Sequence, residues 1–179
     1  MKDFKETNSY CKKGQVVYIG SSYFANMEIT KRVLLSNINT LVYDRSVEKL
    51  TIENAKTFLT EQVFALEPSK IFVNIGDEDL KSAGFDLKQF ISKYEFMMLN
   101  IHRACKNCRI YITSIVSVNP ATKKVNEELY HLAKDTGCTF IDFNCNKKDR
   151  NSYTKVFNIL KQYLLHHPTG SSEAMDIVC

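Results

Sequence analysis

Five short runs of apolar residues, rich in β-branched and aromatic types, are spaced along the chain. Runs of this kind are typical of strands in a parallel sheet that is covered on both faces. The third run leads directly into Gly76 and a series of acids, so it predicts a central strand that ends in a polar turn. The expected strands are 15–20, 40–43, 70–75, 109–114 and 139–142.

Segments with apolar residues at helical spacing alternate with these runs. They predict helices at 26–35, 51–66, 87–105, 125–132 and 153–164. This alternation predicts one domain at 15–165, a three-layer α/β/α sandwich with a five-stranded, mostly parallel sheet and right-handed crossovers. The polar segments 1–14 and 166–179 are expected to be a flexible lead and a flexible tail.

The loops after the strands are where function is expected, because open α/β sheets bind ligands at the carboxyl ends of their strands. Gly20, Ser21 and Ser22 form the first turn, which can place a hydroxyl beside backbone amides that bind an anion. In the third turn, three acids follow Gly76. Both turns have a plainer interpretation, in which a serine or an aspartate caps the next helix.

Composition excludes some classes of partner. Net charge is +4, with 24 basic and 20 acidic residues dispersed along the 179-residue chain, so no stripe indicates a nucleic-acid or membrane surface. The first residues lack the apolar core of a signal peptide, which favours a cytoplasmic location. The six cysteines are therefore expected to be free thiols. Cys105 and Cys108 have the spacing of half a zinc knuckle without a second half, so neither a metal nor a cofactor is expected.

Several segments resemble the sequence blocks of the SGNH or GDSL-type hydrolases, a family that includes bacterial esterases and platelet-activating-factor acetylhydrolases. VVYIGSSYF resembles the first block and VNIGDEDL the third, and the order and spacing of RIYITSIVSVNP and NEELYHLAKDTGCTFIDFN are similar to those of the family. The resemblance covers most of 15–165. It implies the SGNH-hydrolase (flavodoxin-like) fold.

The resemblance also implies roles for individual positions. Ser22 matches the nucleophile, with Ser21 in place of the usual aspartate after Gly20. In that family the serine amide, a glycine and an asparagine form the oxyanion hole. The second block falls on 44–49 and matches the family poorly. Ser46 lies in it, and Lys49 lies near the position of the family's glycine.

In the third block Gly76 and Asp79 match, but Glu78 stands where the family has asparagine. A donor to the developing oxyanion is thus replaced by a carboxylate that repels it. At the family's Asp-x-x-His base, the alignment places Asn144 and Lys147, and the loop 143–151 contains no histidine. Asp77, Glu78 and Asp79 need a counter-ion, for which Lys147, Lys49 or Arg45 is expected, and a Glu78–Lys147 pair would replace the lost chemistry.

Three hypotheses follow from these residues. The first is an SGNH-like domain with little or no esterase activity that keeps a pocket for a small acylated or carbohydrate-like ligand. The second is an active ester hydrolase in which Ser22 uses a non-standard base, Glu78 or Asp79, within hydrogen-bond reach. The third is an unrelated nucleotide-binding module, although neither G-x-G-x-x-G nor G-x-x-x-x-G-K occurs.

Overall fold

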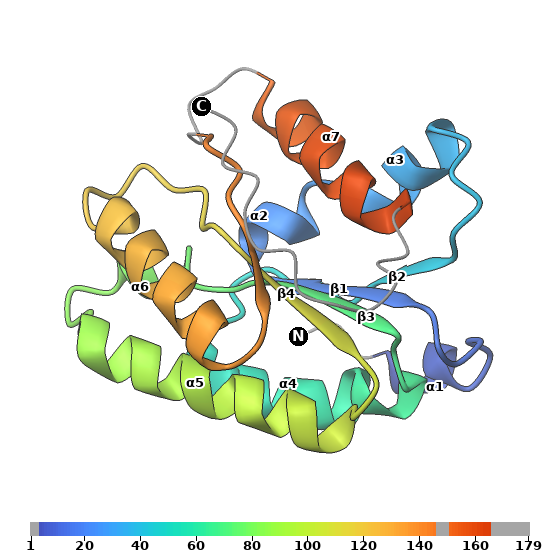
Figure 1. Ribbon diagram of the computed structural model, residues 1–179, viewed down its shortest axis with the longest axis horizontal. Coiled ribbons are helices and arrows are strands. Elements are labelled where there is room, and N and C mark those ends of the chain that lie inside the picture. Colours follow the sequence, from blue (N-terminus) through green and yellow to red (C-terminus); the bar gives the residue numbers. More distant parts are fainter. Residues whose placement is uncertain (1–3, 146–150, 166–179) are drawn as a thin grey trace.

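The computed structural model describes residues 4–145 and 151–165, and it places five strands in one parallel sheet (Figure 1). The strand order is β2-β1-β3-β4-β5, so the chain starts near the centre, moves to one edge and then returns to build the other side. The strands are β1 (Val16–Gly20), β2 (Val42–Asp44), β3 (Lys70–Asn74), β4 (Arg109–Thr113) and β5 (Thr139–Ile141). The expected doubly covered, five-stranded sheet is confirmed, and all four pairings are parallel.

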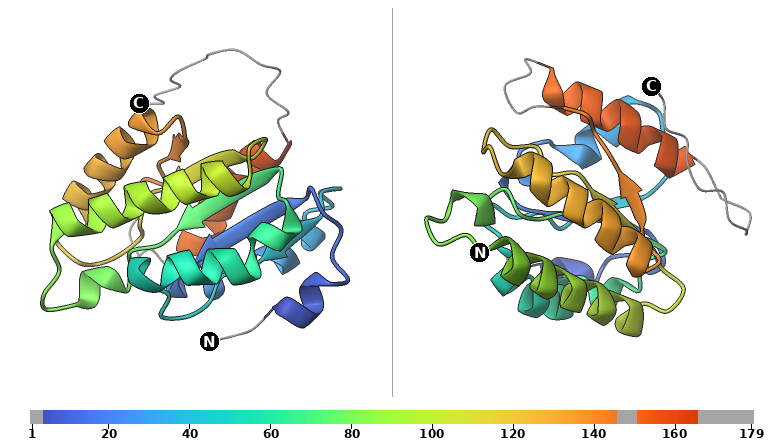
Figure 2. Two further views of the ribbon diagram at one scale, coloured as in Figure 1. Left: turned by 90° about the horizontal axis from the view of Figure 1, so that it is seen from below. Right: turned by 60° about the vertical axis from the view of Figure 1, so that its left-hand side comes forward.

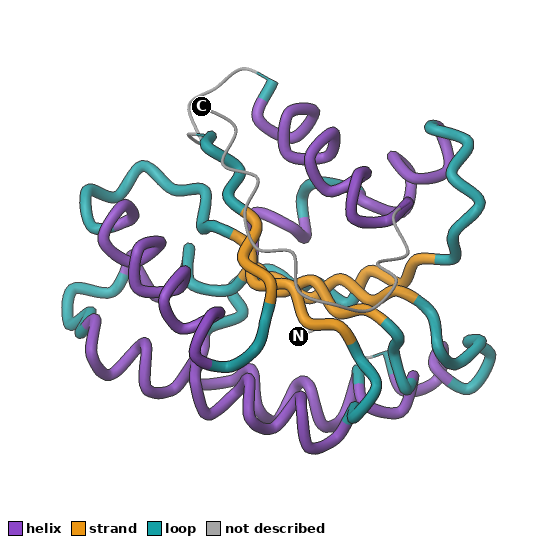
Figure 3. Tube along the Cα trace, in the orientation of Figure 1, coloured by secondary structure: helices purple, strands orange, loops and turns teal. Residues whose placement is uncertain are grey.

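Helices cover both faces of the sheet, as the strands and helices in Figure 3 show. One face is covered by α4 (Ile52–Gln62), α5 (Leu87–Ala104) and α6 (Thr122–Asp135), and the other by α2 (Ser22–Ala25), α3 (Ile29–Leu35) and α7 (Ser152–Leu165) (Figure 2). Short 3-10 turns, η1 (Phe64–Leu66) and η2 (Asp79–Lys81), lie before and after β3. None of the helices in the described ranges has both the length and the apolar character of a membrane span.

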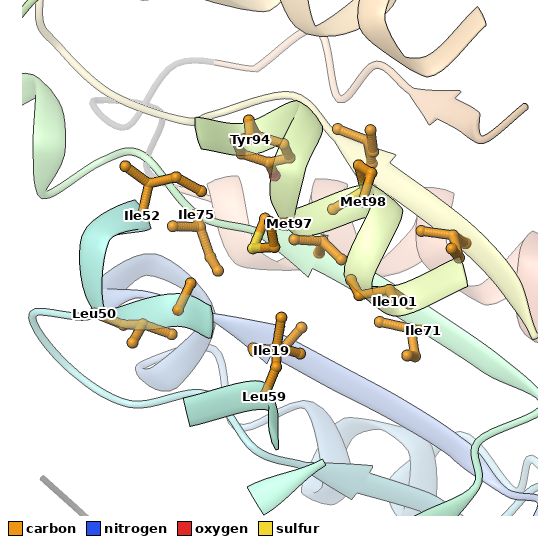
Figure 4. Close-up of a cluster of buried hydrophobic side chains, with 14 of the residues drawn as sticks. Ile19, Leu50, Ile52, Leu59, Ile71, Ile75, Tyr94, Met97, Met98 and Ile101 are labelled. Atoms are coloured by element: carbon orange, nitrogen blue, oxygen red, sulfur yellow. The ribbon is translucent and has the colours of Figure 1, made fainter. Parts of the chain in front are cut away.

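Each face has its own core. On the α4–α5–α6 side, side chains of α5 pack onto those of the strands, as Figure 4 shows for Tyr94, Met97, Met98, Ile101, Ile19 and Ile71. On the other side, three rings from adjacent strands stack: Phe72 lies 4.5 Å from both Tyr18 and Tyr111, with interplanar angles of 6° and 10°. Because these rings lie side by side across β1, β3 and β4, they help to fix the register of the central strands.

Three expected boundaries differ in the structure. Residues 4–14 are not a loose lead: α1 (Lys5–Asn8) forms there, and the Phe4 ring is buried against Phe58 of α4. The helix expected at 26–35 begins only at Ile29, as α3, because Glu28 directly before it adopts a left-handed conformation (φ 53°), and a separate short helix, α2, precedes it. The helix expected at 51–66 ends at Gln62 and continues as the 3-10 turn η1. The tail 166–179 lies outside the described residues.

Candidate functional site

The turns after β1, β2 and β3 lie together at the carboxyl ends of these strands. Gly20 at the end of β1 is in register with Asn74 at the end of β3, and Tyr18 is in register with Asp44 at the end of β2. Neighbouring parallel strands lie about 5 Å apart, so the loops that follow them are adjacent. The sequence-predicted residues Ser22, Lys49 and Glu78 come from these three loops, one from each.

The Ser22 hydroxyl is the point where these loops converge. Its Oγ donates a hydrogen bond to Glu78 Oε1 at 2.5 Å and accepts one from the Lys49 backbone N–H at 3.2 Å. The serine side chain lies at the start of the short helix α2, and it is half-buried. The nucleophile position and the position that carries a carboxylate in place of asparagine are thus in direct contact.

Glu78 is held by a second partner that the sequence interpretation missed. The Lys81 ammonium, one turn further along η2, pairs with the same Oε1 atom, and the Glu78 side chain is only 13% exposed. The signal was present in the three-residue spacing of Glu78 and Lys81. Of the counter-ions expected instead, Lys147 lies outside the described residues, and Arg45 hydrogen-bonds Asn8 Oδ1 at 2.7 Å.

Lys49 contributes its backbone to the site. It has φ 62°, a conformation that favours glycine, at the place where the family resemblance puts a glycine. Its side chain is exposed, while its N–H points at Ser22 Oγ. The second sequence block matches the family poorly, because Lys49 stands where the resemblance puts a glycine. The Lys49 backbone N–H nevertheless donates a hydrogen bond at the site.

Two other predicted pocket residues, Ser21 and Ser46, lie in the turns after β1 and β2. The Ser21 backbone N–H donates to Asn74 O at 3.0 Å, and Ser46 N–H donates to Asp44 Oδ1 at 2.8 Å. Both hydroxyls are buried and have no hydrogen-bond partner among the described residues. Within the described residues, the hydrogen bonds of these two serines are therefore made by their backbone N–H groups, which fix the turns.

The two glycines allow the close packing of these turns. A Cβ on Gly20 would lie 2.6 Å from Phe24 Cβ and 2.9 Å from Asn74 O. Gly76 has φ 136°, and a Cβ there would lie 2.3 Å from Ile115 Cδ1. Both positions exclude a side chain, as the sequence pattern predicted for sharp turns.

The three acids of the third turn, Asp77, Glu78 and Asp79, each have a different hydrogen-bond partner. The Asp77 side chain, 2% exposed, accepts a hydrogen bond from Tyr23 N–H at 3.2 Å and so fixes the start of α2. Both carboxylate oxygens of Asp79 accept from Ile52 N–H, at 3.1 and 3.2 Å, at the start of α4. Glu78 is the acid that accepts the hydrogen bond of the Ser22 hydroxyl. Asp79, the other base that the second hypothesis considered, is a tertiary cap of α4.

Burial raises the pKa of Asp79 from its ordinary value to about 6, and the nearby Asp77 adds to the shift, while the Ile52 N–H opposes it. A raised folded-state pKa means that native protein binds more protons than unfolded protein between about pH 4 and pH 6. The stability that this group contributes is therefore present below pH 4 and is lost as pH rises through 6.

This shift gives a prediction for Asp79→Asn, which keeps an oxygen acceptor for Ile52 N–H but cannot ionise. The free energy of unfolding of the variant minus that of wild type should rise between pH 4 and pH 6 and stay constant above pH 7, as measured by urea denaturation. A difference that is flat or falls over that window would show that ionised Asp79 is not disfavoured in the native state.

The predicted base positions are only partly covered by the structure. Asn144 is exposed, has φ 40°, and its N–H donates to Asp142 Oδ1 at 2.9 Å. Lys147, His166 and His167 lie outside the described residues. Of the histidines within them, His102 Nε2 lies 2.9 Å from Thr136 O, and His131 is beside Tyr130 on α6. Neither of these two imidazoles belongs to the Ser22 site.

A cleft of about 240 Å³ adjoins the site, and Glu78 is one of its lining residues. Thr51, Phe85 and Gln89 are among its lining residues, and an adjoining hollow of about 390 Å³ continues it between α4 and α5. Within the described ranges, no group of three or more His, Cys, Asp or Glu side chains could hold a metal ion, and five cysteines are free thiols.

The arrangement has the fold of known esterases. No family model and no curated protein sequence matches the chain. A solved structure of a candidate platelet activating factor from Streptococcus pneumonia matches with a TM-score of 0.76 at 16% identity, over 90% of this chain and 89% of that chain. A GDSL-like lipase from Bacteroides thetaiotaomicron matches with a TM-score of 0.72 at 14% identity, over 90% and 95% of the two chains. The chain has the SGNH/GDSL-hydrolase fold.

A third structure of the SGNH/GDSL-hydrolase fold is a catalytic mutant of an acetylxylan esterase from Geobacillus stearothermophilus. It matches with a TM-score of 0.69 at 10% identity, over 90% of this chain and 99% of that chain. The fold that the sequence blocks implied is thereby confirmed. At these identities the likeness concerns the fold, and the roles of Ser22, Lys49 and Glu78 remain predictions from the resemblance and the geometry.

Proposed function

We propose that this SGNH/GDSL-fold chain has little or no ester-hydrolase activity and binds a small acylated or carbohydrate-like ligand at its strand-end site. One observation carries the proposal: the Ser22 hydroxyl donates to the carboxylate of Glu78, which stands at the position of an oxyanion-hole asparagine in the resemblance. In this arrangement the serine is a hydrogen-bond donor, and the carboxylate fills the place of the donor that an esterase needs.

The expected effect on catalysis is large. A carboxylate about 4 Å from a developing oxyanion repels it by about 4 kcal/mol at an effective dielectric constant near 20. Such a penalty slows the reaction about a thousandfold. Loss of the asparagine donor costs roughly another hundredfold to thousandfold. Lys81 offsets part of the repulsion, because its ammonium shares the same Glu78 oxygen.

The ligand class is suggested by the surroundings of Glu78. The cleft beside it is lined by hydroxyl, amide and carboxylate groups, one lysine and two phenylalanine rings, a mixture of hydrogen-bonding and apolar groups suited to a sugar. The structure of the same fold named acetylxylan esterase has, as its name says, an acetylated carbohydrate as substrate. Isothermal titration with acetylated xylo-oligosaccharides should show binding to the wild-type chain that Glu78→Ala weakens. If neither the wild type nor the variant gave a heat of binding, carbohydrate-like ligands would be ruled out.

The activity itself can be tested with p-nitrophenyl acetate. The purified chain should turn over this ester with a kcat below about 0.01 s⁻¹, three orders of magnitude under an ordinary enzyme. Ser22→Ala should give the same rate, because the hydroxyl is not used as a nucleophile. A faster rate that is lost in Ser22→Ala would contradict the proposal.

A second function, an ester hydrolase with a Ser22–Glu78 dyad, is favoured by the same 2.5 Å contact, since a base must lie within hydrogen-bond reach of its nucleophile. A carboxylate is about two pKa units less basic than imidazole, however, and therefore activates a serine less well. This function requires that Glu78→Gln abolish turnover as completely as Ser22→Ala does.

Restoring the asparagine tests whether the chain contains a base other than Glu78. Glu78→Asn alone should leave esterase activity absent, because it supplies a donor but no base. The triple variant Glu78→Asn, Asn144→Asp, Lys147→His should give weak hydrolysis of p-nitrophenyl acetate. If the single variant reached a kcat on the order of 10 s⁻¹, a working base would be present in the native chain.

A further inference from the structure

The hollow between α4 and α5 is continuous with the cleft that contains Glu78. Its volume is about 390 Å³, larger than the 240 Å³ of the cleft and within the range of about 300 to 1,000 Å³ that is typical of ligand sites. The hollow and the cleft share three lining residues, Ile52, Glu53 and Lys93, so they form one groove. The two helices that flank it lie side by side (Figure 1). We call the larger part of this groove the α4–α5 hollow.

One side of α5 leads from the cleft into the α4–α5 hollow. Gln89 lines the cleft, Lys93 lines both parts, and Phe96 lines the hollow. Residues three and four positions apart share a helix face, so these three side chains follow one another along the groove. The seven residues from Gln89 to Phe96 span about 10 Å at the rise of an α-helix. A ligand that fills both parts is therefore longer than a single sugar ring.

The α4–α5 hollow is lined by apolar and charged side chains together. Ile52 and Met97 are buried, and Figure 4 shows them on α4 and α5. Phe96, in contrast, is 47% exposed. Glu53 of α4 and Lys93 of α5 form an ion pair between the two helices. Because an exposed pair of this kind contributes little to stability, both charged groups can instead bind the hydroxyls of a ligand.

The exposed ring of Phe96 has a cation beside it. The Lys56 ammonium lies 5.0 Å from the centroid of the ring, and it forms no ion pair with a carboxylate among the described residues. An ammonium donates up to three hydrogen bonds and accepts none, so Lys56 suits the oxygen atoms of a ligand. The ring suits an apolar face of the same ligand. A sugar has both, because its hydroxyls project from a ring whose faces carry C–H groups.

We propose that the α4–α5 hollow binds the further sugar units of an oligosaccharide whose acylated unit lies beside Glu78, an inference that rests on the proposed function. A fatty acyl chain fits this hollow poorly, because Glu53, Lys56 and Lys93 would lose water to an apolar ligand. An extended peptide pairs with an open sheet edge, whereas two helices flank this groove. An oligosaccharide matches both kinds of side chain, and the continuity with the cleft places its next units here.

Isothermal titration with two sugars of different length tests this inference, with monoacetylated xylose as the short ligand and monoacetylated xylotetraose as the long one. The long ligand should bind the wild-type chain about tenfold more tightly, as expected if roughly 60 Å² of apolar surface at Phe96 is buried. Phe96→Ala should remove this gain and leave the affinity for acetylated xylose unchanged. Glu78→Ala should weaken the binding of both sugars.

Leu99→Ala is the matched control. Leu99 is also a partly exposed apolar residue of α5, 41% exposed, and it lines neither part of the groove, so its variant should bind both sugars like wild type. Equal loss of the gain in Phe96→Ala and Leu99→Ala would overturn the inference. So would a gain that follows the acyl group, with octanoyl xylose binding more tightly than acetylated xylose until Phe96 is replaced.

The two sugars also separate this inference from the proposed function. If both bound the wild-type chain equally tightly and Glu78→Ala weakened both, the α4–α5 hollow would not be a sugar site, while the proposed function would stand. If neither sugar bound, both the inference and the proposed carbohydrate-like ligand would be wrong.

Discussion

Gly76→Ala is expected to lower the free energy of unfolding by roughly 2 to 6 kcal/mol, the sum of two penalties of about 1 to 3 kcal/mol each. The first is backbone strain, because φ at this position is 136°, where a residue with a Cβ is disfavoured. The second is overpacking, since the new methyl group would lie 2.3 Å from Ile115 Cδ1 and 2.9 Å from Phe90 Cζ. Urea denaturation at neutral pH measures the change.

Gly84→Ala is the matched control for this experiment. It lies in the same long connection between β3 and α5, and nothing lies within 4 Å of its added Cβ. Its stability should remain within about 0.5 kcal/mol of wild type. If the two alanine variants proved equally stable, the description of a tight turn between β3 and Glu78 would be wrong.

Asn74→Asp should destabilise the fold by about 3 to 5 kcal/mol, as expected when a buried charge has no compensating partner. The Asn74 amide, 1% exposed, donates to Thr113 Oγ1 at 2.8 Å and to Ser114 O at 3.0 Å, and these bonds join the ends of β3 and β4. An aspartate has the same shape but places an oxygen against the Ser114 carbonyl. Chemical denaturation as a function of pH measures the loss.

Two further measurements define this effect. Asn74→Ala should cost less, about 1 to 3 kcal/mol, because it leaves acceptors unpaired without adding a charge. The aspartate variant should also regain stability as pH falls and the new carboxyl takes up a proton. An aspartate variant as stable as wild type at pH 8 would show that Asn74 does not join the two strand ends as described.

The parts of the fold that could be predicted from sequence are those with local causes. β3 was predicted because its apolar run and Gly76 are contiguous in the chain, and the helix spacing of α5 is equally local. The burial of Phe4 could not be predicted in this way, since its N–H donates to Gln62 Oε1, 58 residues further along. The segment 1–14 looks polar in sequence, and only tertiary packing orders its described part.

In the site too, the features with local causes could be predicted from the sequence, and those that depend on tertiary packing could not. The contact between Ser22 and Glu78 was anticipated as one hypothesis because parallel strands bring their carboxyl ends to one edge. The choice between Glu78 and Asp79 depended on which carboxylate the 3-10 turn η2 directs toward α4, and the sequence does not contain that information. The partner of Glu78 was sought in distant loops, although Lys81 lies only three residues away.

The central claim is that Ser22 is a hydrogen-bond donor to Glu78 and is not an activated nucleophile. Incubation with a fluorophosphonate, followed by intact-mass spectrometry, tests this directly, because such reagents phosphonylate serines that a base has activated, with loss of fluoride. The account predicts that the protein's mass stays unchanged, as in Ser22→Ala. Rapid, stoichiometric addition of one phosphonyl group, lost in Ser22→Ala, would contradict it.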